Sequence, residues 1–553
     1  MGAQSWFGLG SLKRITGKGF GMHATERPWW QKATIYQIYI RSFQDSNGDG
    51  IGDLAGILSR VPYLKNLGVD AIWITPFYPS PMADFGYDVS DYCNVDPQFG
   101  SLQDFDRLRD ALHAQGMKIL LDIVPNHTSN QHPWFKEAIS SKQSKKRDWY
   151  IWHDPAPDGG VPNNWWSLSG GPAWQFDAAS GQYYMHSFLA EQPDLNWRNR
   201  DVRHAFYNVM RFWLDRGVDG FRVDVIGGLM KDPHFTDDPV NEEYKETDPD
   251  FLRLKAINSS NRPEVMEVIT EMRGVLSDYH GDRVLIGELY HPIENLVFYY
   301  GKQGEGVHLP FNFNLMWVDW KARSVMDLVS RFEGLLPEGA WPNWVLGNHD
   351  QPRVATRLGA EQARLAMMLI LTLRGTPTLY QGEELGLENA DIPADEIQDL
   401  FAKAGKGQGR DGERTPMPWD QSPYFGFSTH KPWLRLGADS ARRTVAVQEQ
   451  DRHSMLQMTR ALLQLRKEEQ ALSLGDWHPL YADDHVMAYE RALGQTRLFV
   501  VLNLSDTKVD AKPLPSPARC VLSTYLDQDG LPVGLQDKIT LRPHEGRVFK
   551  AIQ

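Results

Sequence analysis

Helix-like and strand-like patterns of apolar residues alternate through most of the chain. From residue 201 to 216, apolar side chains recur at the three- and four-residue spacing of one helix face, and Gly217 ends the pattern. Residues 220–225, GFRVDV, then alternate apolar and polar positions, as a strand with one polar face does. Arg222 and Asp224 share that polar face, where they would form a salt bridge in any case. If the face is buried, the same arginine favours the ionised aspartate that a nucleophile requires.

The same unit recurs along the chain: a helix pattern ends at glycine, a short apolar strand follows, and a polar residue closes the strand. Strands are expected at residues 35–40, 71–75, 118–122, 220–224, 284–288, 311–317, 343–350 and 375–386. Helices that alternate with apolar strands form parallel βαβ units. About eight such units predict an α/β fold, the (β/α)8 or TIM barrel.

Two segments interrupt this repeat. Residues 128–195 follow the third strand, are rich in Trp, Gly, Pro and Asn, and are too long for a simple βα loop. They are expected to form an inserted subdomain on the rim of a barrel made by residues 30–127 and 196–476. Residues 477–553 read as antiparallel strands, which predicts a C-terminal β-sandwich. Residues 1–29 are expected to be a tail, and whether residues 1–21 belong to the native protein stays open.

Carboxylates close several of the predicted strands. Asp122, Asp224, Glu288 and Asp350 all fall at strand C-termini, where barrels of this kind hold their active sites. Like charges repel, so four unrelated helix caps explain this convergence poorly. Glycoside cleavage needs two carboxyls in different environments. Arg222 would keep Asp224 ionised, whereas Glu288 follows an apolar strand without a basic neighbour and is expected to stay protonated, as a general acid requires.

Composition excludes several classes of function. A length of 553 residues requires more than one core, and 41% hydrophobic with 23% charged residues is ordinary for a globular protein. The net charge of −13 offers no basic surface for nucleic acid or anionic membranes. Cys93 and Cys520 are the only cysteines, which argues against a disulfide framework. No apolar run reaches roughly 18 residues, and no signal peptide is recognised, so a cytoplasmic protein is expected, either monomer or homodimer.

Four motifs carry a resemblance to a known family. DIVPNH at 122–127, GFRVDV at 220–225, IGEL at 286–289 and GNHD at 347–350 resemble the signature regions of the α-amylase family, glycoside hydrolase family 13. The similarity extends from Trp30 to the C-terminus. It implies the nucleophile Asp224, the acid/base Glu288 and the third carboxylate Asp350, with Arg222 orienting the nucleophile and with His127 and His349 binding the same sugar. Carboxyls about 5 Å apart would make the enzyme retaining, through a covalent glycosyl–enzyme intermediate.

Two further motifs resemble the α-glucosidase and oligo-1,6-glucosidase branch. FGYDVSDY contains Tyr87 and Asp88, and GRDGERTPMPW spans residues 409–419. The resemblance implies that Asp88 pairs with Arg410, and less plausibly with Arg414, to close the sugar site into a pocket for a terminal glucose. A surface ion pair between two loops is the alternative, and it would stabilise little.

The expected activity is that of an exo-acting retaining α-glucosidase on short malto-oligosaccharides. An oligo-1,6-glucosidase, or a glucosyl transferase or isomerase of the trehalose synthase or sucrose isomerase type, would use the same site. Val225 favours α-1,6 linkages by resemblance, whereas the flanking GGLMKD and LIGELYHPIENLVFYYG resemble α-1,4-specific enzymes. The linkage preference stays open. Non-catalytic transporter heavy chains are also relatives, but they carry a membrane helix and need no catalytic carboxylates.

The loop DSNGDGIGDL, residues 45–54, is the candidate metal site. Oxygen donors at alternate positions, with Gly50 for the turn, suit a hard cation, although Gly56 stands where an EF-hand needs glutamate. Resemblance to oligo-1,6-glucosidase-like enzymes implies structural Ca²⁺, with Mg²⁺ as a second possibility. The implied ligands are the Asp45, Asn47, Asp49 and Asp53 side chains and the Ile51 carbonyl. A metal-free turn rich in Asp and Asn is the alternative.

Overall fold

The computed structural model describes residues 27–246, 248–403, 409–528 and 530–552. Residues 1–26 of the expected N-terminal tail lie outside the described residues. The described chain begins beside a short helix, α1 (Trp29–Lys32), so helical structure starts within the segment expected to be a tail.

Eight parallel strands form the central sheet, in the order β10-β11-β1-β2-β3-β7-β8-β9. The strands are β1 (Ile35–Ile38), β2 (Ala71–Ile74), β3 (Lys118–Ile123), β7 (Gly220–Val223), β8 (Val284–Gly287), β9 (Leu309–Pro310), β10 (Asn343–Val345) and β11 (Thr376–Tyr380). A parallel bridge between Asn312 and Trp344 joins the two edges of the sheet. The predicted barrel is therefore confirmed.

The sixth strand differs from its prediction. The segment expected to be this strand, residues 311–317, contributes the closing bridge and then turns into a 3-10 helix, η6 (Phe313–Met316). Asn312 causes the turn, because its side chain accepts a hydrogen bond from the amide of Asn314. The true strand, β9, lies directly before that segment and is two residues long.

Helices surround the barrel; most bury one face, whereas α11 (Ala360–Thr372) is buried all round from Leu365 to Thr372. The longer ones are α4 (Leu102–Ala114), α6 (Arg200–Asp215), α7 (Val265–Ser277), α9 (Ala322–Leu335), α11 (Ala360–Thr372) and α15 (Met455–Glu468). Shorter ones are α2 (Leu54–Ser59), α3 (Val61–Leu67), α8 (Ile293–Leu296), α10 (Val354–Leu358), α12 (Leu400–Lys403), α13 (Ser440–Arg443), α14 (Val445–Gln450) and α16 (Gln470–Leu474). Ser101 and Asp104 form a capping box at the start of α4.

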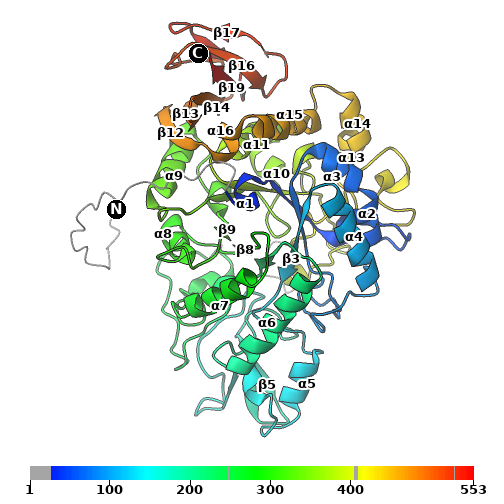
Figure 1. The fold of residues 1–553 in the computed structure, drawn as a ribbon. Coiled ribbons are helices and arrows are strands. Elements are labelled where there is room, and N and C mark those ends of the chain that lie inside the picture. Colours follow the sequence, from blue (N-terminus) through cyan, green and yellow to red (C-terminus); the bar gives the residue numbers. More distant parts are fainter. Residues whose placement is uncertain (1–26, 247, 404–408, 529, 553) are drawn as a thin grey trace, which may run out of the picture.

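Residues 128–195 leave the barrel between β3 and α6. They contain α5 (Pro133–Ile139) and a three-stranded antiparallel sheet of β4 (Trp152–His153), β6 (Gln182–Met185) and β5 (Trp174–Asp177). Trp165 and Trp174 form a small core of their own with Met185. Figure 1 shows this segment at the opposite end of the molecule from the C-terminal strands. The tryptophans of this segment therefore serve partly as its core.

The C-terminal region is a β-sandwich, as predicted. The larger antiparallel sheet holds β12 (Asp476–Ala482), β13 (Val486–Leu493), β14 (Thr496–Asn503), β19 (Gly546–Ala551), β16 (Ala518–Ser523) and β17 (Pro532–Val533). The smaller sheet pairs β15 (Val509–Ala511) with β18 (Ile539–Leu541). Phe499 and Phe549 from the larger sheet pack with Leu541 from the smaller one. Across the described ranges, we find no helix with the length and apolar character that a membrane crossing would require.

Candidate active site

Neighbouring strands bring the predicted catalytic carboxylates to one rim of the barrel. Asp122 lies in β3 and is in register with Arg222 in β7. Asp224 follows β7 directly, and Glu288 follows β8, the next strand of the sheet. Asp350 follows β10 on the far side of the barrel seam. The side chains converge because the C-termini of parallel strands share one edge.

Arg222 is the centre of this cluster. Its side chain is fully buried, and its Nη1 lies 2.7 Å from an oxygen of Asp122 and 2.7 Å from Oδ1 of Asp224. Its Nη2 lies 2.5 Å from Oε1 of Glu288. One guanidinium thus contacts both the predicted nucleophile and the predicted acid/base. Both carboxyls therefore lie against the same guanidinium, and a separation of about 5 Å between them is what a retaining mechanism requires.

The electrostatics of the cluster correct two expectations. Burial raises the pKa of Asp224, and contact with Arg222 opposes this shift without reversing it. Burial likewise raises the pKa of Asp122 to about 7, again against Arg222. Glu288 was expected to lack a basic neighbour, yet Arg222 reaches it from β7. Because one arginine faces three buried carboxylates, its contact only partly offsets the effect of burial on the pKa of Asp122 and Asp224.

Asp350 has a different environment. Arg414 Nη2 lies 2.7 Å and Arg410 Nη1 lies 3.2 Å from the same oxygen, Oδ1. His349 Nε2 lies 3.2 Å from the other oxygen. Although burial acts in the opposite direction, His349 and the two arginines hold the pKa of Asp350 below its ordinary value. An ionised Asp350 can accept hydrogen bonds from two sugar hydroxyls.

The predicted pair of Asp88 and Arg410 does not form. Asp88 is buried and turns toward its own loop, where it accepts hydrogen bonds from Ser80 Oγ, the Ala83 amide and the Asp84 amide. Asp84 takes its place, with Oδ1 at 2.7 Å from Arg410 Nη2. Two aspartates flank this turn, and sequence spacing cannot show which of them faces the cleft.

Asp399 is another partner of Arg410 that the sequence did not reveal. It is buried and accepts hydrogen bonds from the Arg410 backbone amide, Nε and Nη2, each at 2.9 Å. The guanidinium is therefore fixed between Asp399, Asp84 and Asp350. Arg414, the weaker candidate from the sequence, also contacts Asp350 and completes this side of the pocket.

Tyr87 connects the two halves of the site. Its hydroxyl donates to Asp122 Oδ2 at 2.9 Å and lies 2.8 Å from His349 Nε2. The Tyr87 and His349 rings stack at 5.4 Å with an interplanar angle of 6°. Burial lowers the pKa of His349 and of His127, so both imidazoles are neutral. Gln192 joins His127 to Asp84, and the binding of one sugar by both histidines stays a prediction.

Three aromatic rings pack together next to the segment that carries Glu288, a feature that the sequence analysis missed. Tyr290 lies two residues after Glu288, and its hydroxyl accepts a hydrogen bond from Asn348 at 2.8 Å. Its ring stacks on Phe313 at 4.2 Å and lies 5.9 Å from Trp317. Tyr290 is 39% and Trp317 is 53% exposed, so ring faces are open to solvent. Such faces can stack on the apolar side of a sugar.

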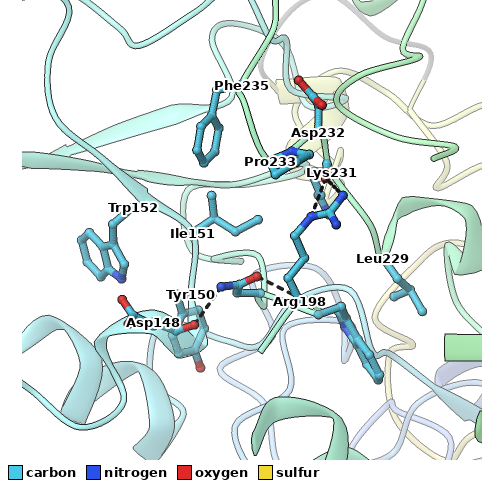
Figure 2. Close-up of a pocket in the computed structure, with 12 residues that line it drawn as sticks. Asp148, Tyr150, Ile151, Trp152, Arg198, Leu229, Lys231, Asp232, Pro233 and Phe235 are labelled. Carbon is cyan, nitrogen blue, oxygen red and sulfur yellow. Dashed lines mark hydrogen bonds between the residues drawn. The ribbon is translucent and has the colours of Figure 1, made fainter. Parts of the chain in front are cut away.

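Lys231 ties the inserted segment to the barrel. Its buried ammonium lies 2.7 Å from Asp194 Oδ2 and donates to Asn126 Oδ1 at 2.7 Å and to the Gly228 carbonyl at 2.5 Å. Beside it lies a cavity of about 230 Å³ that none of the catalytic carboxylates lines (Figure 2). Arg198 crosses this cavity and donates to the Lys231 carbonyl at 2.7 Å. The loop after the nucleophile is thus held by both charged side chains.

We expect Lys231→Met to lower the midpoint of thermal unfolding strongly, by the equivalent of about 3–5 kcal/mol, because Asp194 would remain buried without its counter-charge. Differential scanning calorimetry measures this. The matched control is Lys142→Met: Lys142 lies 4.0 Å from Asp154 in an exposed pair, so its loss should change the midpoint little. Equal midpoints for the two variants would contradict the structural role of Lys231.

The predicted metal ligands all lie on the loop between β1 and α2. Both oxygens of Asp45 accept hydrogen bonds from backbone amides of the loop, and Asp53 caps α2 through the Gly56 amide. Asn47 and Asp49 are exposed. No group of three or more Asp, Glu, His or Cys side chains in the described ranges is placed to hold a metal ion. The oxygen donors suit a hard cation in kind, and the Ca²⁺ site stays a prediction.

Comparison with known proteins places this site in a family. The protein family described as "Alpha amylase, catalytic domain" matches residues 37–475 of this chain. A probable α-glucosidase of Rhizobium meliloti (strain 1021) is 41% identical over 507 residues, which cover 89% of this chain and 92% of that protein. An oligo-1,6-glucosidase of Heyndrickxia coagulans is 38% identical over 564 residues, which cover 94% of this chain and 99% of that protein.

Solved structures agree with this assignment. The structure of the α-glucosyl transfer enzyme XgtA matches with a TM-score of 0.89 at 40% sequence identity. The match covers 95% of this chain and 100% of the XgtA chain. A mutant isomaltulose synthase from Erwinia rhapontici NX5, solved with its natural substrate sucrose, matches with a TM-score of 0.85 at 33% identity, covering 95% and 99%. With this fold, these relatives and the carboxylates at the barrel rim, the chain belongs to the α-amylase family of glycoside hydrolases.

Proposed function

We propose that this enzyme is an exo-acting, retaining α-glucosidase that releases glucose from the non-reducing ends of short α-glucosides. The observation that carries this proposal is the charged network beside Asp350. Arg410 is fixed between Asp84, Asp350 and Asp399, and in the proposed site this network stands beyond the terminal glucose. A buried charged network of this kind blocks a continuous cleft and offers hydrogen bonds to the hydroxyls of one terminal ring.

The cluster around Arg222 supports a two-step mechanism. Glu288 protonates the glycosidic oxygen while Asp224 attacks the anomeric carbon, which forms a covalent glucosyl–enzyme. Glu288 then removes a proton from water, and this water displaces Asp224 with overall retention. Arg222 contacts both carboxylates, so it can balance the charge that moves between them. Asp350, kept ionised, binds hydroxyls of the sugar as it distorts toward the oxocarbenium-like state.

A transfer reaction is the second candidate, because the covalent intermediate can react with a sugar instead of water. The exposed rings of Tyr290 and Trp317 favour it, since they offer a stacking surface for a sugar and Tyr290 lies two residues after Glu288. Relatives named oligo-1,6-glucosidase and α-glucosidase, together with an α-glucosyl transfer enzyme, support both candidates and leave the linkage open.

Product analysis with maltose, isomaltose, trehalose and sucrose separates these candidates. We expect free glucose as the main product from maltose, with the α-anomer formed first when the reaction is followed by proton NMR. Initial release of β-glucose would contradict a retaining mechanism. A disaccharide product with little glucose would identify the enzyme as a transferase or isomerase instead.

We also propose that Ca²⁺ binds the loop of residues 45–53 in a purely structural role. What supports it is the series of oxygen donors at alternate positions. Chelation should then lower the thermal unfolding midpoint while the rate constant at 25 °C changes little, because the ion stabilises only the folded loop. Adding Ca²⁺ back should restore the midpoint. No shift with chelator, measured by calorimetry, would show that hydrogen bonds alone close this loop.

A further inference from the structure

The residue after the nucleophile has an unusual backbone. Val225 has φ 45° and ψ 43°, in the left-handed region. This conformation brings Cβ close to the following carbonyl oxygen, and a β-branched side chain makes it worse. Chains keep such conformations only where the surrounding structure enforces them, and they cluster at functional sites. Val225 lies directly between Asp224 and the short helix η3 (Ile226–Gly228), so the strain occurs at the catalytic centre.

Three contacts hold Val225 in this conformation. Its amide donates to Glu288 Oε2 at 3.1 Å, and its carbonyl accepts from the Gly228 amide at 2.8 Å. On the preceding residue, the Asp224 amide donates to the Ile123 carbonyl at 2.9 Å. A Cβ at position 228 would lie 2.9 Å from Val225 Cγ1, so glycine there leaves the room that this turn needs.

The amide contact is significant because of what it does to Glu288. Arg222 Nη2 contacts Oε1 of this carboxyl, and the Val225 amide is bound to Oε2. The backbone amide of Glu288 donates to the Val223 carbonyl at 3.1 Å, which fixes the start of the side chain. Both ends of the acid/base residue are therefore anchored on β7 and on the turn that follows it.

We propose that the backbone amide of Val225 is a positioning group for the acid/base Glu288, and that its strained conformation is maintained because it directs this amide at Oε2. The proposal rests on the proposed function, since it assigns Glu288 the acid/base role. It concerns the backbone at position 225 and is independent of what the side chain does to linkage preference.

The contacts of Glu288 predict the direction in which the pH dependence of activity changes when the Val225 N–H is removed. An N–H group bound to a carboxylate oxygen favours the ionised form. The other ionisable groups that face Glu288 or its immediate neighbours are Arg222, Asp122, Asp224, Asp350 and Tyr290. None of these changes when only the Val225 amide is removed. Loss of the amide should therefore make the acid hold its proton to higher pH.

The sharpest test replaces Val225 with α-hydroxyisovaleric acid by stop-codon suppression, which turns the amide into an ester and deletes only the N–H. We expect the basic limb of the kcat/KM profile on maltose to move upward by about half to one pH unit. Val225→Ala keeps the amide and is the matched control, so its limb should stay at the wild-type position. An unmoved limb in the ester variant would show that the amide is merely structural and would overturn the proposal.

A second measurement tests the strain itself. Glycine normally destabilises a site relative to alanine, but the order reverses where φ is positive. We expect Val225→Gly to unfold at a higher temperature than Val225→Ala. The opposite order would mean that position 225 is unstrained, and the proposal would fail. Turnover by the wild-type enzyme tests the proposed function separately, so the two failures are distinguishable.

Discussion

Replacing Asp224 with asparagine lowers kcat/KM on maltose by at least about 10³-fold while the protein stays folded. The amide has nearly the same shape, but it is a poor nucleophile and cannot form the glucosyl ester. Because burial raises the pKa of Asp224, its charge is unfavourable in the free enzyme, so the asparagine variant should unfold at the same temperature or higher. Steady-state kinetics and calorimetry measure the two effects.

Glu288→Gln gives a loss that depends on the leaving group. Without an acid, maltose hydrolysis should fall by about 10²–10⁴-fold, whereas α-glucosyl fluoride, whose leaving group needs no proton, should still form the intermediate.

Added azide should accelerate turnover of the Glu288→Ala variant and give α-glucosyl azide. For Asp224→Ala, azide should instead give the β-azide, since it attacks from the vacated face. If Asp224→Asn kept substantial hydrolysis, or if the azide products were exchanged, the roles assigned here would be wrong.

The second large effect is expected at Asp84. Asp84→Asn keeps the shape of the side chain but removes the charge that holds Arg410 Nη2 at 2.7 Å. Arg410 would keep Asp399 and Asp350, so the fold should survive. We expect kcat/KM on maltose to fall by about 10²-fold, because charge-assisted hydrogen bonds to the terminal glucose and its pocket are weakened. Most of the loss should appear in KM.

Asp88→Asn is the matched control, four residues away on the same loop. Asp88 accepts hydrogen bonds from the Ala83 and Asp84 amides, and among the described residues its carboxylate makes no ion pair with Arg410. Its substitution should therefore lower the unfolding midpoint and leave kcat/KM within about threefold of wild type. The reverse result, with Asp88 affecting kinetics and Asp84 silent, would restore the pairing that the sequence suggested and contradict the pocket described here.

The contrast between these two aspartates shows where sequence reasoning reaches its limit. The motif DFGYD places two carboxylates on one turn, and the motif alone cannot orient them. Only Asp84 contacts Arg410, which lies 326 positions further along the chain. Asp399, which holds the Arg410 side chain in place, belongs to no motif that was recognised. The environment of Glu288 was likewise misjudged, because its basic neighbour comes from the adjacent strand and not from the adjacent sequence.

The sequence by itself predicted the barrel, the inserted segment, the C-terminal sandwich and the positions of Asp122, Asp224, Glu288 and Asp350 at strand ends. These features follow from local periodicity and from strand ends, which the geometry of parallel strands brings to one rim. The roles expected of Asp224, Glu288 and Asp350 were implied by the motifs that resemble the α-amylase family. Tertiary structure alone decided which side chains touch: Arg222 shared among three carboxylates, Asp84 facing Arg410, and the amide of Val225 turned onto Glu288. Such contacts depend on side-chain direction and burial, which are set by neighbours distant in sequence.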